Sequence, residues 1–171
     1  MPTKISTFLS LLCVLIFAGS TNAQNIKLTR LTALSNLKLC TSNPKKDSSD
    51  CEDSARFLEK LYEEGDRSLL TPLFNAGLKS DGALSEELGT FYADVLFSKT
   101  KDFLVTLSLR PKKEQKTLAF LAVSADGSRN AENWNVKIKS RLREIANTRG
   151  KLSSTARLCL GQLELFLAQK R

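Results

Sequence analysis

Apolar residues recur at helical spacing along most of this chain. The clearest stripe runs through Leu84, Leu88, Phe91 and Val95, at intervals of three and four residues. This spacing places one continuous apolar face along a helix that begins near Ser80. The dominant period of the sequence is therefore that of amphipathic helices.

Further stripes, bounded by helix start and stop signals, predict more helices. Ser49 and Glu52 form a capping box, and Gly65 supplies a residue able to end that helix with a positive φ angle. A helix over 67–79 follows, in which Pro72 either introduces a kink or marks the first turn. Three others are predicted, one from Pro111 to Asp126-Gly127, one from Asn130 to Gly150, and one from Ser153 or Ser154 to the C-terminus.

Two segments fit either a helix or a strand. Leucines in 26–39 have helical spacing but also alternate with polar residues, and the apolar positions of 103–109 alternate before Pro111. The joints between the predicted helices are short, which makes sequential neighbours antiparallel. We therefore predict an all-α fold of consecutive antiparallel helical hairpins, either an irregular HEAT/armadillo-like solenoid or a compact helical bundle.

The first 23 residues have the pattern of an export signal. Lys4 precedes an apolar core from Phe8 to Ala18, and Thr21-Asn22-Ala23 offers small residues for cleavage. The apolar core is shorter than the roughly 20 residues that span a bilayer. We expect a signal peptide at 1–23, a secreted or periplasmic location and no transmembrane span in the mature chain. A segment with a polar loop at 24–48 and a helical region at 49–171 would form one domain.

Cysteine usage agrees with an oxidising compartment. Cys40 and Cys51 flank a wholly polar stretch, so a covalent closure would be useful there, and we predict a disulfide between them. Cys159 lies on an apolar stripe with Ala156, Leu160 and Leu163, which favours a buried, inert thiol over a reactive one.

Positive charge is concentrated in the second half of the chain. Residues 24–98 hold 9 Lys and Arg against 12 Asp and Glu, whereas residues 99–171 hold 16 against 6. A basic surface attracts polyanions, although such lysines are often only solvated helix faces. The candidate contact residues are in two groups, Lys112, Lys113 and Lys116, and Lys137, Lys139, Arg141 and Arg143.

The residue inventory excludes many catalytic classes. The sequence contains no histidine, so histidine-based triads, histidine general bases and histidine-liganded zinc are excluded. Paired carboxylates remain, since glycoside hydrolysis needs only an acid and a base or nucleophile. The adjacent pairs Glu63-Glu64 and Glu86-Glu87 diverge by about 100° on a helix and do not face one cleft. No metal site or cofactor is predicted.

These observations favour an exported, non-enzymatic helical binding or scaffold domain. The expected partner is a protein or an anionic envelope polymer, contacted through the basic C-terminal half. Nucleic acid is disfavoured, because the basic region has a single Trp and no binding motif. The expected state is a monomer. The alternative is a small cell-wall-active glycosidase that uses carboxylates.

Overall fold

The computed structural model describes residues 28–43, 48–125 and 133–170, and this part of the chain is all-helical. The predicted signal at 1–23, the turn at Asp126-Gly127 and the cap at Asn130 lie outside the described residues. The helices are α1 (Arg30–Ser42), α2 (Ser48–Glu63), α3 (Leu70–Gly77), α4 (Gly82–Ser98), α5 (Thr100–Ser108), α6 (Lys112–Ser124), α7 (Trp134–Ala146) and α8 (Ser153–Gln169).

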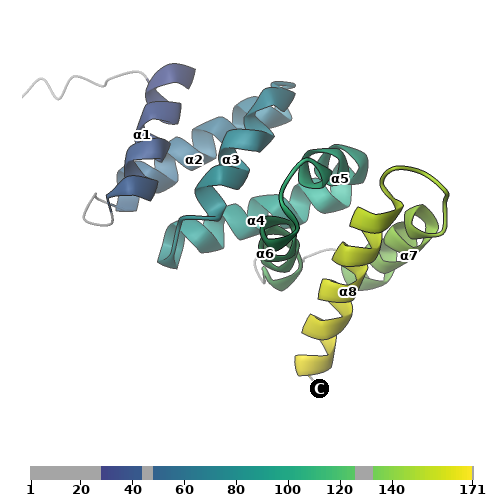
Figure 1. The fold of residues 1–171 in the computed structure, drawn as a ribbon. Helices are drawn as coiled ribbons and strands as arrows, with labels where there is room; N and C mark the ends of the chain where they lie inside the picture. Colours follow the sequence, from purple (N-terminus) through teal and green to yellow (C-terminus); the bar gives the residue numbers. More distant parts are fainter. Residues whose placement is uncertain (1–27, 44–47, 126–132, 171) are drawn as a thin grey trace, which may run out of the picture.

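The helices follow one another across the molecule in chain order, from α1 and α2 at one end to α7 and α8 at the other (Figure 1). The most extensive contacts join α6 to α8, followed by those of α1 with α2 and of α7 with α8. Through the middle of the molecule, α2, α4, α6 and α8 form a chain of neighbours. The predicted all-α fold of packed helical hairpins is confirmed, and the arrangement is consistent with a compact helical bundle.

Both ambiguous segments form helices. The first is helical from Arg30 onward, as part of α1. The second lies within and just after α5, in which Phe103, Leu104 and Leu107 are buried. The apparent alternation of the second segment included Val105 and Leu109, whose exposed fractions are 48% and 79%. These two residues lie on the outer face, so the spacing of the buried positions is that of a helix.

Several predicted helix ends are confirmed and others move. Gly65 has a φ of +122° after α2, and a 3₁₀ turn, Arg67–Leu69, precedes α3, so that Pro72 lies in the first turn of α3. The predicted cap Ser49 already lies inside α2. The predicted stop at Gly150 is late, because α7 ends at Ala146, whose carbonyl oxygen accepts hydrogen bonds from Ser153 and Arg157 of α8. Those side chains satisfy the end of α7 before the glycine is reached.

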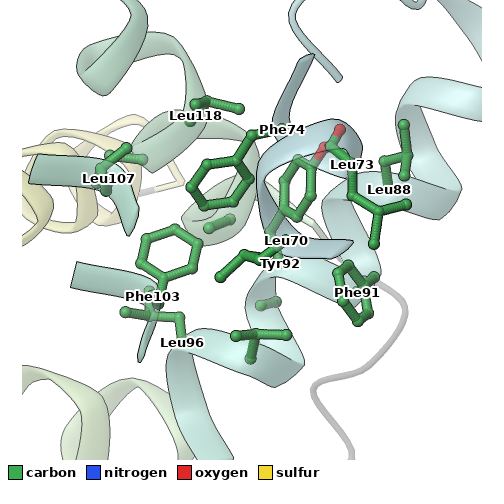
Figure 2. Close-up of a cluster of buried hydrophobic side chains, with 14 of the residues drawn as sticks. Leu70, Leu73, Phe74, Leu88, Phe91, Tyr92, Leu96, Phe103, Leu107 and Leu118 are labelled. Atoms are coloured by element: carbon green, nitrogen blue, oxygen red, sulfur yellow. The ribbon is translucent and has the colours of Figure 1, made fainter. Parts of the chain in front are cut away.

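An aromatic cluster forms the centre of the core between α3, α4 and α5 (Figure 2). The Phe74 ring lies edge-to-face with Tyr92 at 5.2 Å and with Phe103 at 5.3 Å between ring centroids. The buried Tyr92 hydroxyl donates to the Leu73 carbonyl oxygen at 2.6 Å. A Cβ at Gly77 would overlap the Tyr92 side chain, so this glycine allows α3 to approach α4. The cluster packs α3 against α4 and α5.

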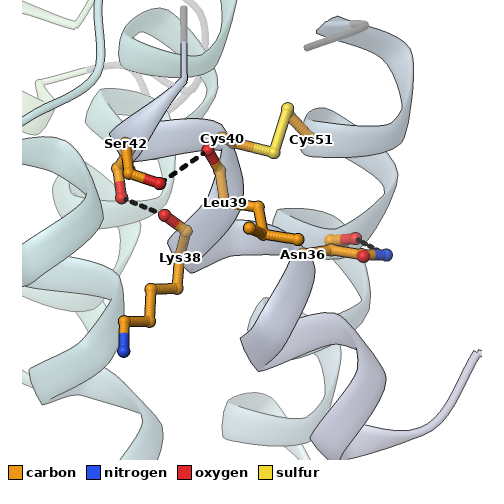
Figure 3. Close-up of a disulfide and its surroundings, with 8 residues drawn as sticks. Asn36, Lys38, Leu39, Cys40, Ser42 and Cys51 are labelled. Carbon is orange, nitrogen blue, oxygen red and sulfur yellow. Dashed lines mark hydrogen bonds between the residues drawn. A yellow bond between two sulfur atoms is a disulfide. The ribbon is translucent and has the colours of Figure 1, made fainter.

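The predicted disulfide is present. Cys40 and Cys51 are bonded and join the last turns of α1 to the first turns of α2 (Figure 3). Cys159 is fully buried, and desolvation raises the pKa of its thiol to about 12, which makes it inert at physiological pH. Among the described residues, no helix has both the length and the apolarity to cross a bilayer.

Candidate binding site

The structure separates the two groups of cations that the sequence singled out. Lys112, Lys113 and Lys116 lie in the first turns of α6, which packs on α4 and α8. Lys137, Lys139, Arg141 and Arg143 lie on α7, which packs mainly on α8. The two groups are therefore on different helices and do not line one groove in the described part of the chain.

Most of the α7 cations make contacts within the molecule. Lys139 forms an ion pair with Glu164 at 3.0 Å, and Arg143 approaches the same carboxylate at 3.4 Å. The hydrogen bond from Lys139, followed by its charge, lowers the pKa of Glu164. These two cations join α7 to α8. Lys137 and Arg141 are exposed, and the described residues supply no ion pair for either of them.

Arg141 has a structural position. Its guanidinium donates to the carbonyl oxygen of Phe97 and to Thr100 Oγ1, and lies 5.7 Å from the centroid of the Phe97 ring. The Phe97 ring stacks on Trp134 with 6.2 Å between centroids. Arg141 therefore satisfies the end of α4 and anchors α7. Reversing its charge would disturb packing as well as any external contact.

The first turns of α6 contribute to an open groove of about 730 Å³ between α1, α3 and α6, which we call the lysine groove. Its apolar floor and walls include Leu34, Leu37, Pro72 and Leu78. Lys38, Lys79 and Lys113 line it, one from α1, one from the residues that follow α3 and one from α6. Figure 3 shows Lys38 extending from α1 away from the Cys40–Cys51 bond. Of the candidate residues, only Lys113 belongs to this groove; Lys112 and Lys116 are exposed beside it.

The lysine groove contains little negative charge to neutralise its lysines. Glu114 is the carboxylate among its lining residues, and it lies 3.8 Å from Arg110 Nη1. Arg110 also donates to the Thr71 carbonyl oxygen at 2.9 Å and to Asn75 Oδ1 at 2.7 Å. Arg110 thus ties α6 to α3 and orients Asn75 at the groove wall. The three lysines are exposed, and within the described residues they form no ion pair.

A second groove, of about 680 Å³, lies between α2, α4 and α6, and we call it the glutamate groove. Glu52, Glu86 and Glu87 line it together with small residues such as Ala83 and Gly89. Arg56 lies 2.9 Å from Glu87 and 3.4 Å from Glu52. Two of the three carboxylates are therefore already paired with a cation of the same molecule.

Glu59 is a partly buried carboxyl that the sequence interpretation missed. Burial raises its pKa to about 8, with further increases from Glu87 and Glu63, partly offset by Arg56. Its Oε1 atom is buried, and no described residue forms a hydrogen bond with it. A signal was present in the sequence, since Glu59 follows Ala55 by four residues on the buried stripe of α2. Glu59 is not among the described residues that line either groove.

The described residues also lack a metal-binding constellation, because no three or more Cys, Asp or Glu side chains are grouped so as to hold an ion. No protein-family model, curated protein or solved structure matches this chain. The geometry of the two grooves and the chemistry of their side chains are therefore the features that bear on function.

Proposed function

We propose that this chain is an exported, non-catalytic binding domain that engages an anionic macromolecule through the lysine groove. The observation that carries the proposal is the convergence of Lys38, Lys79 and Lys113 on an apolar floor. These lysines are far apart in sequence, and the fold brings them to one opening. Charge of one sign in a concave surface raises the association rate and the affinity for the opposite sign.

The Cys40–Cys51 bond supports the exported part of the proposal. Disulfides form and persist in oxidising compartments, and a signal peptide at 1–23 would deliver the chain to one. The bond also holds one wall of the groove, because Lys38 lies two residues before Cys40 on α1. A wall fixed before binding lowers the entropy cost of association.

The contact surface proposed here differs from the basic C-terminal half as a whole. Lys139, Arg141 and Arg143 are occupied by contacts within the molecule, whereas the groove lysines are available to a partner. Two of those lysines, Lys38 and Lys79, come from the half of the chain that carries net negative charge. Local arrangement, more than net charge, selects this surface.

The test is affinity capture from an envelope extract of the producing organism with two variants of equal net charge. K38Q/K79Q/K113Q removes the groove lysines, and K60Q/K101Q/K151Q removes three exposed lysines elsewhere. We expect the first variant to lose the captured component and the second to retain it. We also expect capture by the unmodified chain to weaken at high salt. Equal capture by both variants would refute the groove as the contact site.

A further inference from the structure

We propose that the lysine groove takes a short acidic segment of a partner protein that carries aliphatic side chains beside its carboxylates. This inference rests on the proposed function, since it names the chemical class of partner for the same groove. The proposed partner is a peptide, as distinct from the other anionic macromolecules that a cationic surface attracts.

The apolar floor of the groove favours a partner with aliphatic side chains. Leu37 is 3% exposed, and Leu34 and Leu78 pack against the core while still lining the opening. An aliphatic side chain laid on this floor removes apolar surface from water on both partners. Phosphate polymers and acidic polysaccharides have no such side chains, so they would leave the floor uncovered.

The separation of the three lysines around the groove favours a ligand with several separated carboxylates. The three lysines come from three different parts of the chain around the opening, so no single site holds all of the positive charge. Each ammonium is a point charge on a flexible stem and can meet a carboxylate at a range of positions. A segment with several separated Asp or Glu residues fits this distribution. A compact phosphate group would favour the planar, bidentate fork of arginine, and the described residues that line the groove include no arginine.

Polar groups on the walls of the groove suit the backbone of a bound peptide. Thr41 Oγ1 donates to the Lys38 carbonyl oxygen at 3.0 Å, and Thr117 Oγ1 donates to that of Lys113 at 3.3 Å. Asn75 lines the groove, and its Oδ1 accepts from Arg110, so the orientation of its amide is set. An oriented amide N–H group suits a backbone carbonyl oxygen of a bound chain. The concave shape also disfavours a flat lipid surface as the partner.

Panning a random peptide library identifies the ligand chemistry that the groove prefers. A phage-displayed library of random dodecapeptides is panned on the wild-type chain, with counter-selection on K38Q/K79Q/K113Q. We expect the recovered peptides to combine Asp or Glu with Leu, Ile or Val. One of them, synthesised with a fluorescent label, is then titrated by fluorescence anisotropy. We expect at least a tenfold weaker affinity for K38Q/K79Q/K113Q and a change of less than twofold for K60Q/K101Q/K151Q.

Two further probes separate the peptide from a simple polyanion. An oligoglutamate of the same length and charge should bind at least tenfold more weakly than the selected peptide, because it cannot cover the floor. L78S should weaken the selected peptide and leave the weak binding of oligoglutamate unchanged. Thermal melts check that each variant is folded.

The outcomes distinguish the two proposals. If extract capture depends on the groove lysines, but oligoglutamate binds as tightly as any selected peptide, the proposed function stands and the peptide inference is wrong. The same holds if panning yields no peptide whose binding depends on the groove. If neither capture nor peptide binding depends on these lysines, both proposals are wrong.

Discussion

The lysine groove and the glutamate groove are similar in volume, about 730 and 680 Å³, and opposite in charge. They differ in how much of that charge the molecule itself neutralises. Arg56 pairs with two of the three carboxylates of the glutamate groove, whereas the three lysines of the other groove have no ion pair within the described residues. A charged surface is available to a partner only where the fold leaves it uncompensated.

The two grooves also differ in what lies beneath the charge. The glutamate groove is lined by small residues such as Ala83, Ser85 and Gly89, which offer little apolar area. A Cβ at Gly89 would lie 3.4 Å from the carbonyl oxygen of Leu121, an ordinary van der Waals distance, so α4 and α6 pack closely at this glycine. The lysine groove has leucines and a proline in the equivalent role. The first groove serves helix packing, and the second presents apolar surface.

The largest change in stability is expected from replacing Glu59, the partly buried carboxyl whose pKa is raised by the paired Glu87 as well as by burial. Its folded pKa of about 8 lies above the ordinary 4.5, so the folded state binds more protons between these values and stability falls as pH rises through this window. Glu59→Gln removes this cost and should raise the free energy of unfolding at pH 9 by about 4 kcal/mol. At pH 4 the two proteins should be nearly equal.

Urea denaturation of wild-type and Glu59→Gln proteins across pH 4 to 9 measures this difference directly. Glu64→Gln on an exposed position of the same segment is the matched control and should show no comparable pH dependence. A stability difference between Glu59→Gln and wild type that does not change with pH would contradict the assignment of a raised pKa.

The next largest effect should come from opening the disulfide, which joins α1 of the lysine groove to α2 of the glutamate groove. Replacing Cys40 and Cys51 with serine frees a loop with a sequence separation of 11 and should lower the free energy of unfolding by about 3 kcal/mol. Hydrogen exchange should accelerate most in α1, which forms a wall of the lysine groove. In the glutamate groove, α4 carries neither cysteine and should be affected less.

Mass spectrometry of exchanging peptides, with urea denaturation, measures both consequences. A reducing agent should reproduce the loss in the wild-type protein and have no effect on the double variant. Uniform acceleration across α1, α2 and α4 would show that the bond does not act locally on the lysine groove.

A smaller effect is expected from removing the internal counter-ion of the glutamate groove. Arg56→Gln leaves Glu52 and Glu87 without their shared cation and removes a charge that lowers the pKa of Glu59. The variant should melt at a lower temperature at pH 8, and 1 M salt should reduce the difference because Arg56 is solvent-exposed. Lys60→Gln on the same helix is the control. A higher melting temperature for Arg56→Gln at pH 8 would contradict the pairing described here.

The smallest effect on stability is expected from the groove lysines themselves. Lys38, Lys79 and Lys113 are exposed and unpaired within the described residues, so K38Q/K79Q/K113Q should change the free energy of unfolding by no more than about 0.5 kcal/mol. Urea denaturation beside wild type checks this. A large loss would mean that these lysines serve the fold, and the contrast with the Arg56 cluster would disappear.

Features set by short stretches of sequence were predicted well. The Cys40–Cys51 bond closes a polar loop, Gly65 ends a helix with a positive φ, and Pro111 directly precedes α6. The stripe of α4 was clear because its apolar positions keep helical spacing over several turns. Each of these depends on residues within a few turns of one another.

The candidate site was predicted only in part. Lys113 was among the cations that the sequence singled out, but Lys38 and Lys79 were not, because they lie in the half of the chain with net negative charge. Arg141 and Lys139 were predicted to be contact residues, and the structure places them against Phe97 and Glu164. Whether a surface cation is free depends on the helix opposite it, which the local sequence does not specify.

The sequence by itself determined the helical class, most of the helix starts and stops, and the covalent closure at Cys40 and Cys51, because each follows from local backbone preference, apolar spacing or chain proximity. Only the tertiary structure decided which charges remain available. Helix packing brings α1, α3 and α6 around one opening and places Arg56 between Glu52 and Glu87. Electrostatic attraction acts through space, so its outcome is set by which helices become neighbours.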